Sequence, residues 1–200
     1  MADIYVKKTG NDSTGDGSNG SPYLTITKAV SVVNNSDRII IGAGTYTENN
    51  IGSAVTKTNV RICDLGDGMV IISGSDGTAD ASTGNVIRAY NGWIIDGSTG
   101  SNLQNIEILG GKRSCVSSKS GTKNFSVKNC ILTGRGDRRD NLTANATQFA
   151  IYNAGGNEVT IRNCVMRNFL YGFNQAASNS GATKFHNNIC YSAGYSGSTY

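Results

Sequence analysis

Val127-Lys128-Asn129-Cys130-Ile131 is a short pattern that returns, with substitutions, at three other places in the second half of the chain. The other copies are Leu103-Gln104-Asn105-Ile106, Ile161-Arg162-Asn163-Cys164-Val165 and Phe185-His186-Asn187-Asn188-Ile189. Aligned on the residue before the aliphatic one, the copies are spaced by 25, 34 and 24 residues, measured between Asn105, Cys130, Cys164 and Asn188. The middle interval contains a polar insertion of roughly ten residues, Gly134 to Ala144, so the underlying period is about two dozen.

A repeat of this length indicates stacked structural units rather than a closed globule. Each copy alternates apolar and polar residues, as a short strand does, and is followed by Gly, Asn or Ser. Stacking in register predicts one ladder of Asn105, Cys130, Cys164 and Asn188, and a second ladder of Ile106, Ile131, Val165 and Ile189. The sequence therefore predicts an all-β fold, a parallel β-solenoid, with single strands over Phe125–Ile131, Val159–Val165 and Lys184–Cys190.

The composition is typical of many short strands joined by tight turns. Of 200 residues, 26 are Gly, one is Pro and 16% are charged. A chain of this length is enough for one domain. The net charge of +4 permits an acidic partner without requiring one. Because no basic run stands out, we expect no nucleic-acid partner.

The cysteines do not predict a disulfide framework. The five are Cys63, Cys115, Cys130, Cys164 and Cys190. They are odd in number, form no CxxC pair and lie in apolar segments, so we expect buried free thiols. With His186 as the one histidine, no zinc spacing exists, and we expect no metal or cofactor.

The first six residues, Met1 to Val6, lack the basic stretch and apolar core of a signal peptide. No run of residues is long enough and apolar enough to span a membrane. We therefore expect synthesis in a cytoplasm, with any export by another route.

The N-terminal part predicts a cap. A strand at Ile4–Val6 and a polar loop precede an amphipathic helix, whose apolar residues Ile26, Ala29, Val30 and Val33 recur at helical spacing. Ser21 or Thr25 can cap this helix and Pro22 suits its start. We expect residues 1–36 to cover one end of the solenoid and 37–200 to form its coils. The strand at Phe185–Tyr191 should stack on the coil containing Ile161–Val165, with no cap after it, so that the solenoid is incomplete at this end.

The first fifty residues resemble a known superfamily. The matching residues are Ile4-Tyr5-Val6, Thr9-Gly10-Asn11-Asp12, Ser21-Pro22-Tyr23, Thr25-Ile26, Ala29-Val30 and Ile39-Ile40-Ile41-Gly42-Ala43-Gly44-Thr45-Tyr46. Together they look like the N-terminal cap and first coil of pectate-lyase-like right-handed parallel β-helix proteins. This resemblance implies a right-handed β-helix. It does not imply one activity, because the superfamily includes lyases, hydrolases, epimerases and phage tailspikes.

The catalytic sets of that superfamily are not recognisable. The segment Trp93-Ile94-Ile95-Asp96-Gly97 resembles the Trp-Ile-Asp-His segment of classical pectate lyases, but it has an extra Ile and Gly97 in place of the His. No Arg-x-Pro-x-x-Arg element follows, and the polygalacturonase motifs are absent. We therefore interpret Asp96 as a turn residue and assign no catalytic residue.

The insertion after Gly134 carries the densest charge cluster, formed by Arg135, Asp137, Arg138, Arg139 and Asp140. Insertions in repeat proteins often carry binding sites, so these residues are candidates for contact with a glycan or a partner. The alternative is a solvated loop whose charges pair among themselves. Phe169, Tyr171 and Phe173 alternate along one segment and are either sugar-stacking or core residues, of which core packing is favoured.

Two functions follow. The first is a non-enzymatic structural or adhesion component of a bacteriophage virion surface, of decoration, fibre or tailspike type. Its partners would be other virion subunits, possible homotrimer neighbours or a cell-surface polysaccharide; a non-classical extracellular route is the alternative location. The second is a polysaccharide lyase or glycoside hydrolase acting on an acidic polysaccharide. A groove with two carboxylates, or a carboxylate and a cation, about 5–10 Å apart would favour the enzyme.

Overall fold

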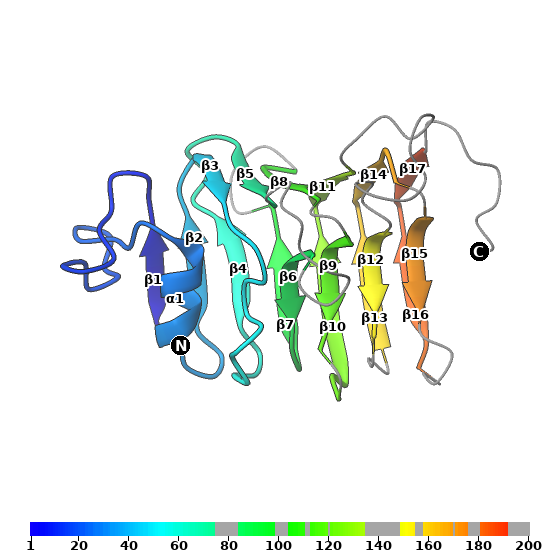
Figure 1. Ribbon diagram of the computed structural model, residues 1–200, viewed down its shortest axis with the longest axis horizontal. Coiled ribbons are helices and arrows are strands. Elements are labelled where there is room, and N and C mark those ends of the chain that lie inside the picture. Colours follow the sequence, from blue (N-terminus) through cyan, green and yellow to red (C-terminus); the bar gives the residue numbers. More distant parts are fainter. Residues whose placement is uncertain are drawn as a thin grey trace.

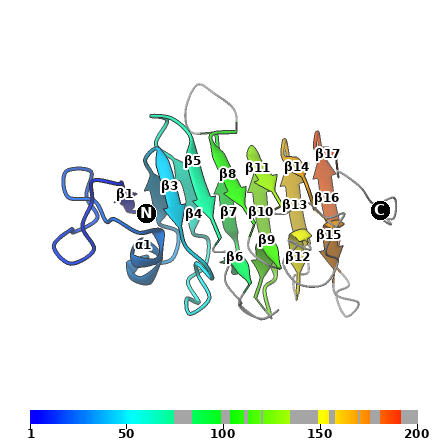
Figure 2. The ribbon, with the colours of Figure 1, turned by 45° about the horizontal axis from the view of Figure 1, so that its top comes forward.

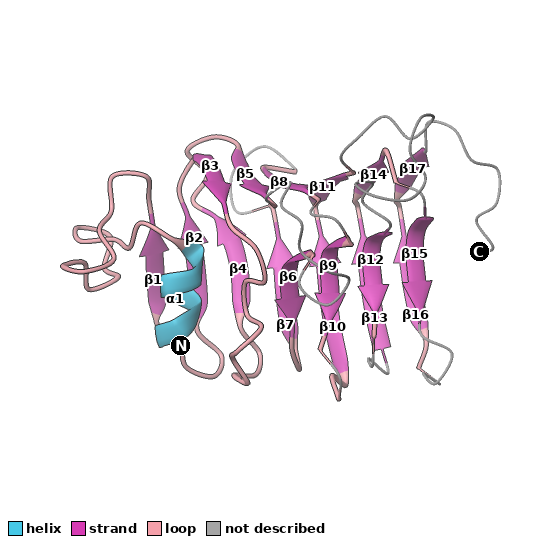
Figure 3. Ribbon diagram, viewed as in Figure 1, coloured by secondary structure: helices cyan, strands magenta, loops and turns pink. Residues whose placement is uncertain are grey.

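The computed structural model is a parallel β-solenoid, and in its described part a short helix lies at the N-terminal end (Figure 1, Figure 3). It describes residues 1–74, 84–98, 104–110, 113–119, 121–134, 149–154, 158–169, 171–175 and 181–191. Among these residues, the strands form three sheets in which every neighbouring pair is parallel. The predicted fold class, a parallel β-helix, is confirmed.

The three sheets are named A, B and C. Sheet A contains β1 (Asp3–Val6), β2 (Arg38–Ile41), β4 (Arg61–Asp64), β7 (Trp93–Asp96), β10 (Asn124–Lys128), β13 (Glu158–Arg162) and β16 (Thr183–His186). Sheet B contains β3 (Gly44–Thr47), β5 (Val70–Ser73), β8 (Ile106–Leu109), β11 (Cys130–Thr133), β14 (Val165–Arg167) and β17 (Ile189–Tyr191). Sheet C contains β6 (Asn85–Ala89), β9 (Ser114–Ser118), β12 (Phe149–Asn153) and β15 (Tyr171–Gln175).

The chain visits sheets A, B and C in rotation, so that each coil lies on the one before it (Figure 2). In place of a sheet C strand, the first coil contributes Ile51, which forms an isolated parallel bridge with Ile87 of β6. Register partners along sheet A are 23 residues apart from Arg38 to Arg61 and 24 apart from Val159 to Thr183. The predicted period of about two dozen is therefore the length of the shortest coils.

The core consists of aliphatic columns that run along the solenoid axis. In sheet A the register aligns Ile39, Ile62, Ile95, Val127 and Ile161, all fully buried. Because strand side chains alternate between faces, the residues between these positions lie on the side of sheet A away from the core. That side is called here the outer face of sheet A.

The helix α1 (Ile26–Val32) lies beside β1 and β2 at the N-terminal end of the solenoid (Figure 1). Thr25 is its N-cap, and the Thr25 hydroxyl accepts a hydrogen bond from the Lys28 N–H. Ser21, the other candidate, does not cap the helix. The predicted apolar face, Ile26, Ala29, Val30 and Val33, is buried in the core.

One part of the repeat alignment was wrong. The stacking of Ile131 on Val165 and of Val165 on Ile189 is confirmed, but Ile131 pairs with Glu107 and Cys130 pairs with Ile106. The copy at 103–106 is thus displaced by one residue. The reason is that its sheet A strand is β7, which ends at Asp96, and residues 97–105 are inserted between β7 and β8.

Three predicted single strands are each divided at a corner between sheets A and B. Asn129, Asn163 and Asn187 occupy these corners with φ values of 52°, 53° and 50°. Among residues that carry a side chain, asparagine is one of the few that adopt this left-handed conformation readily. The asparagines of the repeat are therefore corner residues, and the chain changes sheet at each.

Four of the five cysteines, Cys63, Cys115, Cys130 and Cys164, are buried free thiols as predicted. Cys190 is free but exposed, which corrects the prediction for that residue, because β17 has one strand neighbour, β14, within the described chain. Burial raises the pKa of the Cys164 thiol to about 11. Burial also raises the pKa of Cys130, so these thiols stay protonated.

Candidate functional site

The charge cluster predicted as a binding site, Arg135, Asp137, Arg138, Arg139 and Asp140, lies outside the described residues. By sequence it belongs to the connection between β11, which ends at Thr133, and β12, which begins at Phe149. Its candidacy stays a prediction.

The aromatic residues near β15 differ in position. Phe169 precedes β15 and is buried, which confirms core packing for this ring. Phe173 is partly buried against the core and makes an edge-to-face contact with Phe185. The side chain of Tyr171 lies outside the described part of the structure. The two described rings are therefore packing residues rather than an exposed sugar platform.

The outer face of sheet A carries the best-defined group of polar side chains. The register aligns one residue from each strand in a single column: Tyr5, Ile40, Cys63, Asp96, Lys128, Arg162 and His186. This column is apolar or weakly polar in its first three positions, acidic at the fourth and basic at the last three. The sequence of charges along the solenoid axis is fixed by strand register alone.

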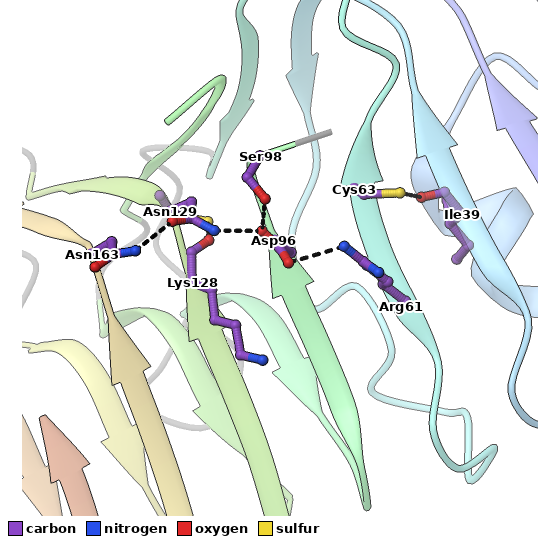
Figure 4. Close-up of polar contacts among 9 residues, drawn as sticks. Ile39, Arg61, Cys63, Asp96, Ser98, Lys128, Asn129 and Asn163 are labelled. Atoms are coloured by element: carbon purple, nitrogen blue, oxygen red, sulfur yellow. Dashed lines mark hydrogen bonds and ion pairs between the residues drawn. The ribbon is translucent and has the colours of Figure 1, made fainter. Parts of the chain in front are cut away.

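Asp96 is the most connected residue of the column (Figure 4). Its carboxylate accepts hydrogen bonds from Arg61 Nη2 at 3.0 Å, from Ser98 Oγ at 2.6 Å and from Asn129 Nδ2 at 2.8 Å. Asp96 is 7% exposed and ends β7 at the corner before Gly97. With all these donors in place, the carboxylate holds the corner together.

The corner also explains the glycine at position 97. A Cβ on Gly97 would lie 2.3 Å from the Asn129 carbonyl oxygen, so no side chain fits without backbone movement. Beyond it, Asn163 Nδ2 donates to Asn129 Oδ1 at 3.0 Å, which continues the row of hydrogen bonds from Asp96 (Figure 4). The histidine of the classical lyase segment could not be accommodated at this position. The interpretation of Asp96 as a turn residue was wrong, because Asp96 is the last residue of strand β7, where its carboxylate accepts hydrogen bonds from neighbouring coils.

Lys128, Arg162 and His186 follow Asp96 in the column on three successive coils. Lys128 is half-buried, whereas Arg162 and His186 are exposed. Within the described ranges, no carboxylate forms an ion pair with Lys128 or Arg162. Parallel strands lie about 4.8 Å apart, so these side chains repeat at that interval along the axis. They are called here the basic column.

A shallow depression of about 240 Å³ lies at the other end of the same strands, over Ile94, Ser126 and Thr160. Glu158 is the carboxylate at its edge, and Lys184 Nζ lies 2.6 Å from that carboxylate. Strand register aligns Arg162 with Lys128, and Lys128 with Asp96. Glu158 lies four residues before Arg162, and a strand rises about 3.3 Å per residue, so Glu158 and Asp96 are separated by about 13 Å along the strand direction. This exceeds the separation of about 5–9.5 Å that paired glycosidase carboxylates need.

A second polar cluster lies on sheet B. The Glu107 carboxylate accepts hydrogen bonds from Thr133 Oγ1 at 2.6 Å and from Arg167 Nη2 at 3.1 Å. The hydrogen bond to Glu107 raises the pKa of Arg167, and Tyr191 adds to the effect. Because its charges compensate each other, this cluster has less need of an outside ligand than the basic column.

Among the described residues, no group of three or more His, Cys, Asp or Glu side chains is arranged to hold a metal ion. In the same part of the chain, no helix is long and apolar enough to cross a membrane.

A scan against protein-family models and a search among curated proteins both give no match. The assignment of the protein to the class of parallel β-solenoids rests on its three sheets of parallel strands.

The basic column was not predicted, yet the sequence contains a signal for it. The residue before the repeated asparagine is basic in three of the four copies, as Lys128, Arg162 and His186. In the other copy Gln104 takes that place in the sequence, but in the structure the position belongs to Asp96. A period-based count of charge at this position would have found the column.

Proposed function

We propose that this protein is a non-enzymatic binding component that holds an acidic polysaccharide along the outer face of sheet A. The basic column carries the proposal. Lys128, Arg162 and His186 are fixed in register on successive coils, so a polyanion running along the solenoid axis meets them in turn. The backbone that presents them is already ordered, which reduces the entropy lost on binding.

The proposal is non-enzymatic because the carboxylates of this face are engaged by neighbours. Asp96 accepts three hydrogen bonds and Glu158 pairs with Lys184. A general base needs a lone pair within reach of a substrate proton, and a glycosidase needs two such carboxyls close together.

The resemblance of the first fifty residues to the pectate-lyase-like superfamily, which includes phage tailspikes, supports a place on the surface of a bacteriophage virion. We extend the proposal to that location, with the polysaccharide being one on a host cell surface. A rigid rod of stacked coils suits presentation of a long ligand.

The test is titration of the whole chain with an acidic polysaccharide and with a neutral one of similar length, at low and high salt. We expect saturable binding of the acidic polymer, weakened by salt because the contacts are exposed. The double variant Lys128→Gln with Arg162→Gln should bind roughly tenfold less tightly, since exposed ion contacts contribute up to about 1 kcal/mol each.

Lys184→Gln is the matched control. It removes a cation from the same face, but one already paired with Glu158, and should leave the affinity nearly unchanged. Equal binding by the double variant would overturn the proposal. Release of unsaturated or reducing sugars from the polymer would instead support the lyase or hydrolase.

A further inference from the structure

A second cationic group lies on sheet C, on a different side of the solenoid. Arg88 of β6 and Ser117 of β9 are register partners, adjacent to the core pair Ile87 and Val116. Because strand side chains alternate, Arg88 and Ser117 lie on the side of sheet C opposite that core pair. Lys119 directly follows the end of β9, two residues beyond Ser117.

Polar atoms in this group are buried without partners. The Nε atom of Arg88 and the hydroxyl oxygen of Ser117 are both buried, and neither has a hydrogen-bond partner among the residues that the structure describes. Ser117 is only 2% exposed. Buried donors are nearly always satisfied in folded proteins, and two adjacent unsatisfied donors indicate a missing acceptor.

The backbone places Lys119 beside this pair, because its N–H donates at 3.0 Å to the carbonyl oxygen of Ala89, the residue after Arg88. Its ammonium donates to the Val55 carbonyl oxygen at 2.8 Å and lies over the Tyr90 ring, 5.3 Å from the centroid. Both contacts leave N–H donors of the ammonium available. Burial lowers the pKa of Lys119, and the positive charge of Arg88 lowers it further.

No Asp or Glu in the part of the chain that the structure describes forms an ion pair with Arg88 or Lys119. We propose that Arg88, Ser117 and Lys119 form a binding site for an oxyanion group, namely sulfate, phosphate or carboxylate. The guanidinium Nε–H, the hydroxyl and the ammonium are donors on residues that strand pairing brings together at one edge of this sheet, and such groups prefer anionic oxygen. The site is independent of the basic column on sheet A.

The test is an NMR titration of the isotopically labelled whole chain with sodium sulfate at constant ionic strength. We expect saturable shifts of the Arg88 Nε–H resonance and of the Ser117 and Lys119 amides. Arg88→Gln and Lys119→Gln should each weaken sulfate binding by about tenfold or more, because each removes a charged donor. Arg38→Gln, which removes a cation paired with Asp3, is the matched control and should bind sulfate as the unmodified protein does.

Parallel titrations with phosphate, a sulfated monosaccharide and a methyl uronoside distinguish a free ion from a group carried on a sugar. If Arg88→Gln does not fold, Lys119→Gln and Ser117→Ala carry the comparison. Shifts that stay linear with every ligand, or binding that neither Gln variant weakens, would overturn the site. The Lys128 and Arg162 variants should not change this binding, so failure here is distinct from failure of the polysaccharide proposal.

Discussion

At the scale of single residues, Asn129 meets two requirements at one corner. Its backbone has a positive φ of 52°, and its amide links Asp96 to Asn163. A left-handed conformation costs most residues about 1–2 kcal/mol, and asparagine less. The side chain also satisfies a buried carboxylate that would otherwise lose a donor.

Two substitutions at Asn129 separate these requirements. Asn129→Ala should lower the free energy of unfolding by about 2–3 kcal/mol, because it combines backbone strain with loss of the amide hydrogen bonds. Asn129→Gly also loses those hydrogen bonds but tolerates the positive φ, and should lose about 1 kcal/mol less. Chemical denaturation followed by circular dichroism measures both. Equal losses would mean that backbone strain contributes nothing at this corner.

At the scale of elements, carboxylates attach the N-terminal cap to the first coil. The Asp37 carboxylate accepts hydrogen bonds from the Ala2 N–H at 2.6 Å and from the Asn34 N–H at 2.9 Å. The Glu48 carboxylate accepts from the Ile26 and Thr27 N–H groups at the start of α1. The strand β1, the helix and the first coil are thereby joined through charged acceptors.

Asp37 should make the cap sensitive to acid. The hydrogen bond from the Ala2 N–H lowers the pKa of Asp37, against the opposing effect of burial, and the Asn34 N–H lowers it further. A carboxyl with a lowered folded-state pKa stabilises the fold fully above its unfolded value of about 3.9. That stability is lost as the pH falls from this value through the lower folded-state pKa.

Asp37→Asn tests this pH dependence. The variant should be less stable at pH 7 by about 1–3 kcal/mol, the contribution of hydrogen bonds to a charged acceptor. The difference between the two proteins should shrink below about pH 4. Denaturation curves at pH 7 and pH 3 provide the measurement. An unchanged difference at pH 3 would show that the charge of Asp37 is not what stabilises the cap.

At the scale of the whole molecule, each coil contacts the coils before and after it, so stability depends on neighbours along one axis. β7 and β10 each have strands on both sides in sheet A. β16 and β17 have one strand neighbour each among the described residues. On this last coil, Phe185 is 49% exposed and Ile189 is 59% exposed.

Hydrogen exchange should therefore show a gradient. We expect amides of β7 and β10 to exchange with nearly the global free energy of unfolding, and amides of β16 and β17 to exchange much faster by local opening. Exchange followed by NMR or mass spectrometry on the whole chain measures this. Protection of β17 equal to that of β10 would contradict fraying from this end and would indicate that the last coil is covered.

The class of fold, the period and most strand positions could be predicted from the sequence, because alternation and stacking are local patterns repeated along the chain. The helix and its buried face were also readable, since Thr25 and the apolar spacing act within two turns. The displaced copy at Asn105 shows where this ended. Because residues 97–105 are inserted between β7 and β8, the segment Leu103 to Asn105 matches the repeat in sequence although the sheet A strand of this coil is β7. Only strand pairing reveals which segment enters the sheet.

The candidate sites depend on tertiary structure because they consist of residues brought together by register. Lys128, Arg162 and His186 occupy the same position of the repeat, so the sequence contained a signal for their alignment. Strand register places them next to one another on successive coils. Arg88 and Ser117 share no motif, and their adjacency follows from the pairing of two strands of sheet C. The sequence by itself determined that the chain stacks in coils, because each short strand can bury its apolar side only against another coil. Which polar side chains meet on the outer faces was decided by strand register, because pairing that buries the apolar side chains also fixes which polar residues become neighbours on the opposite face.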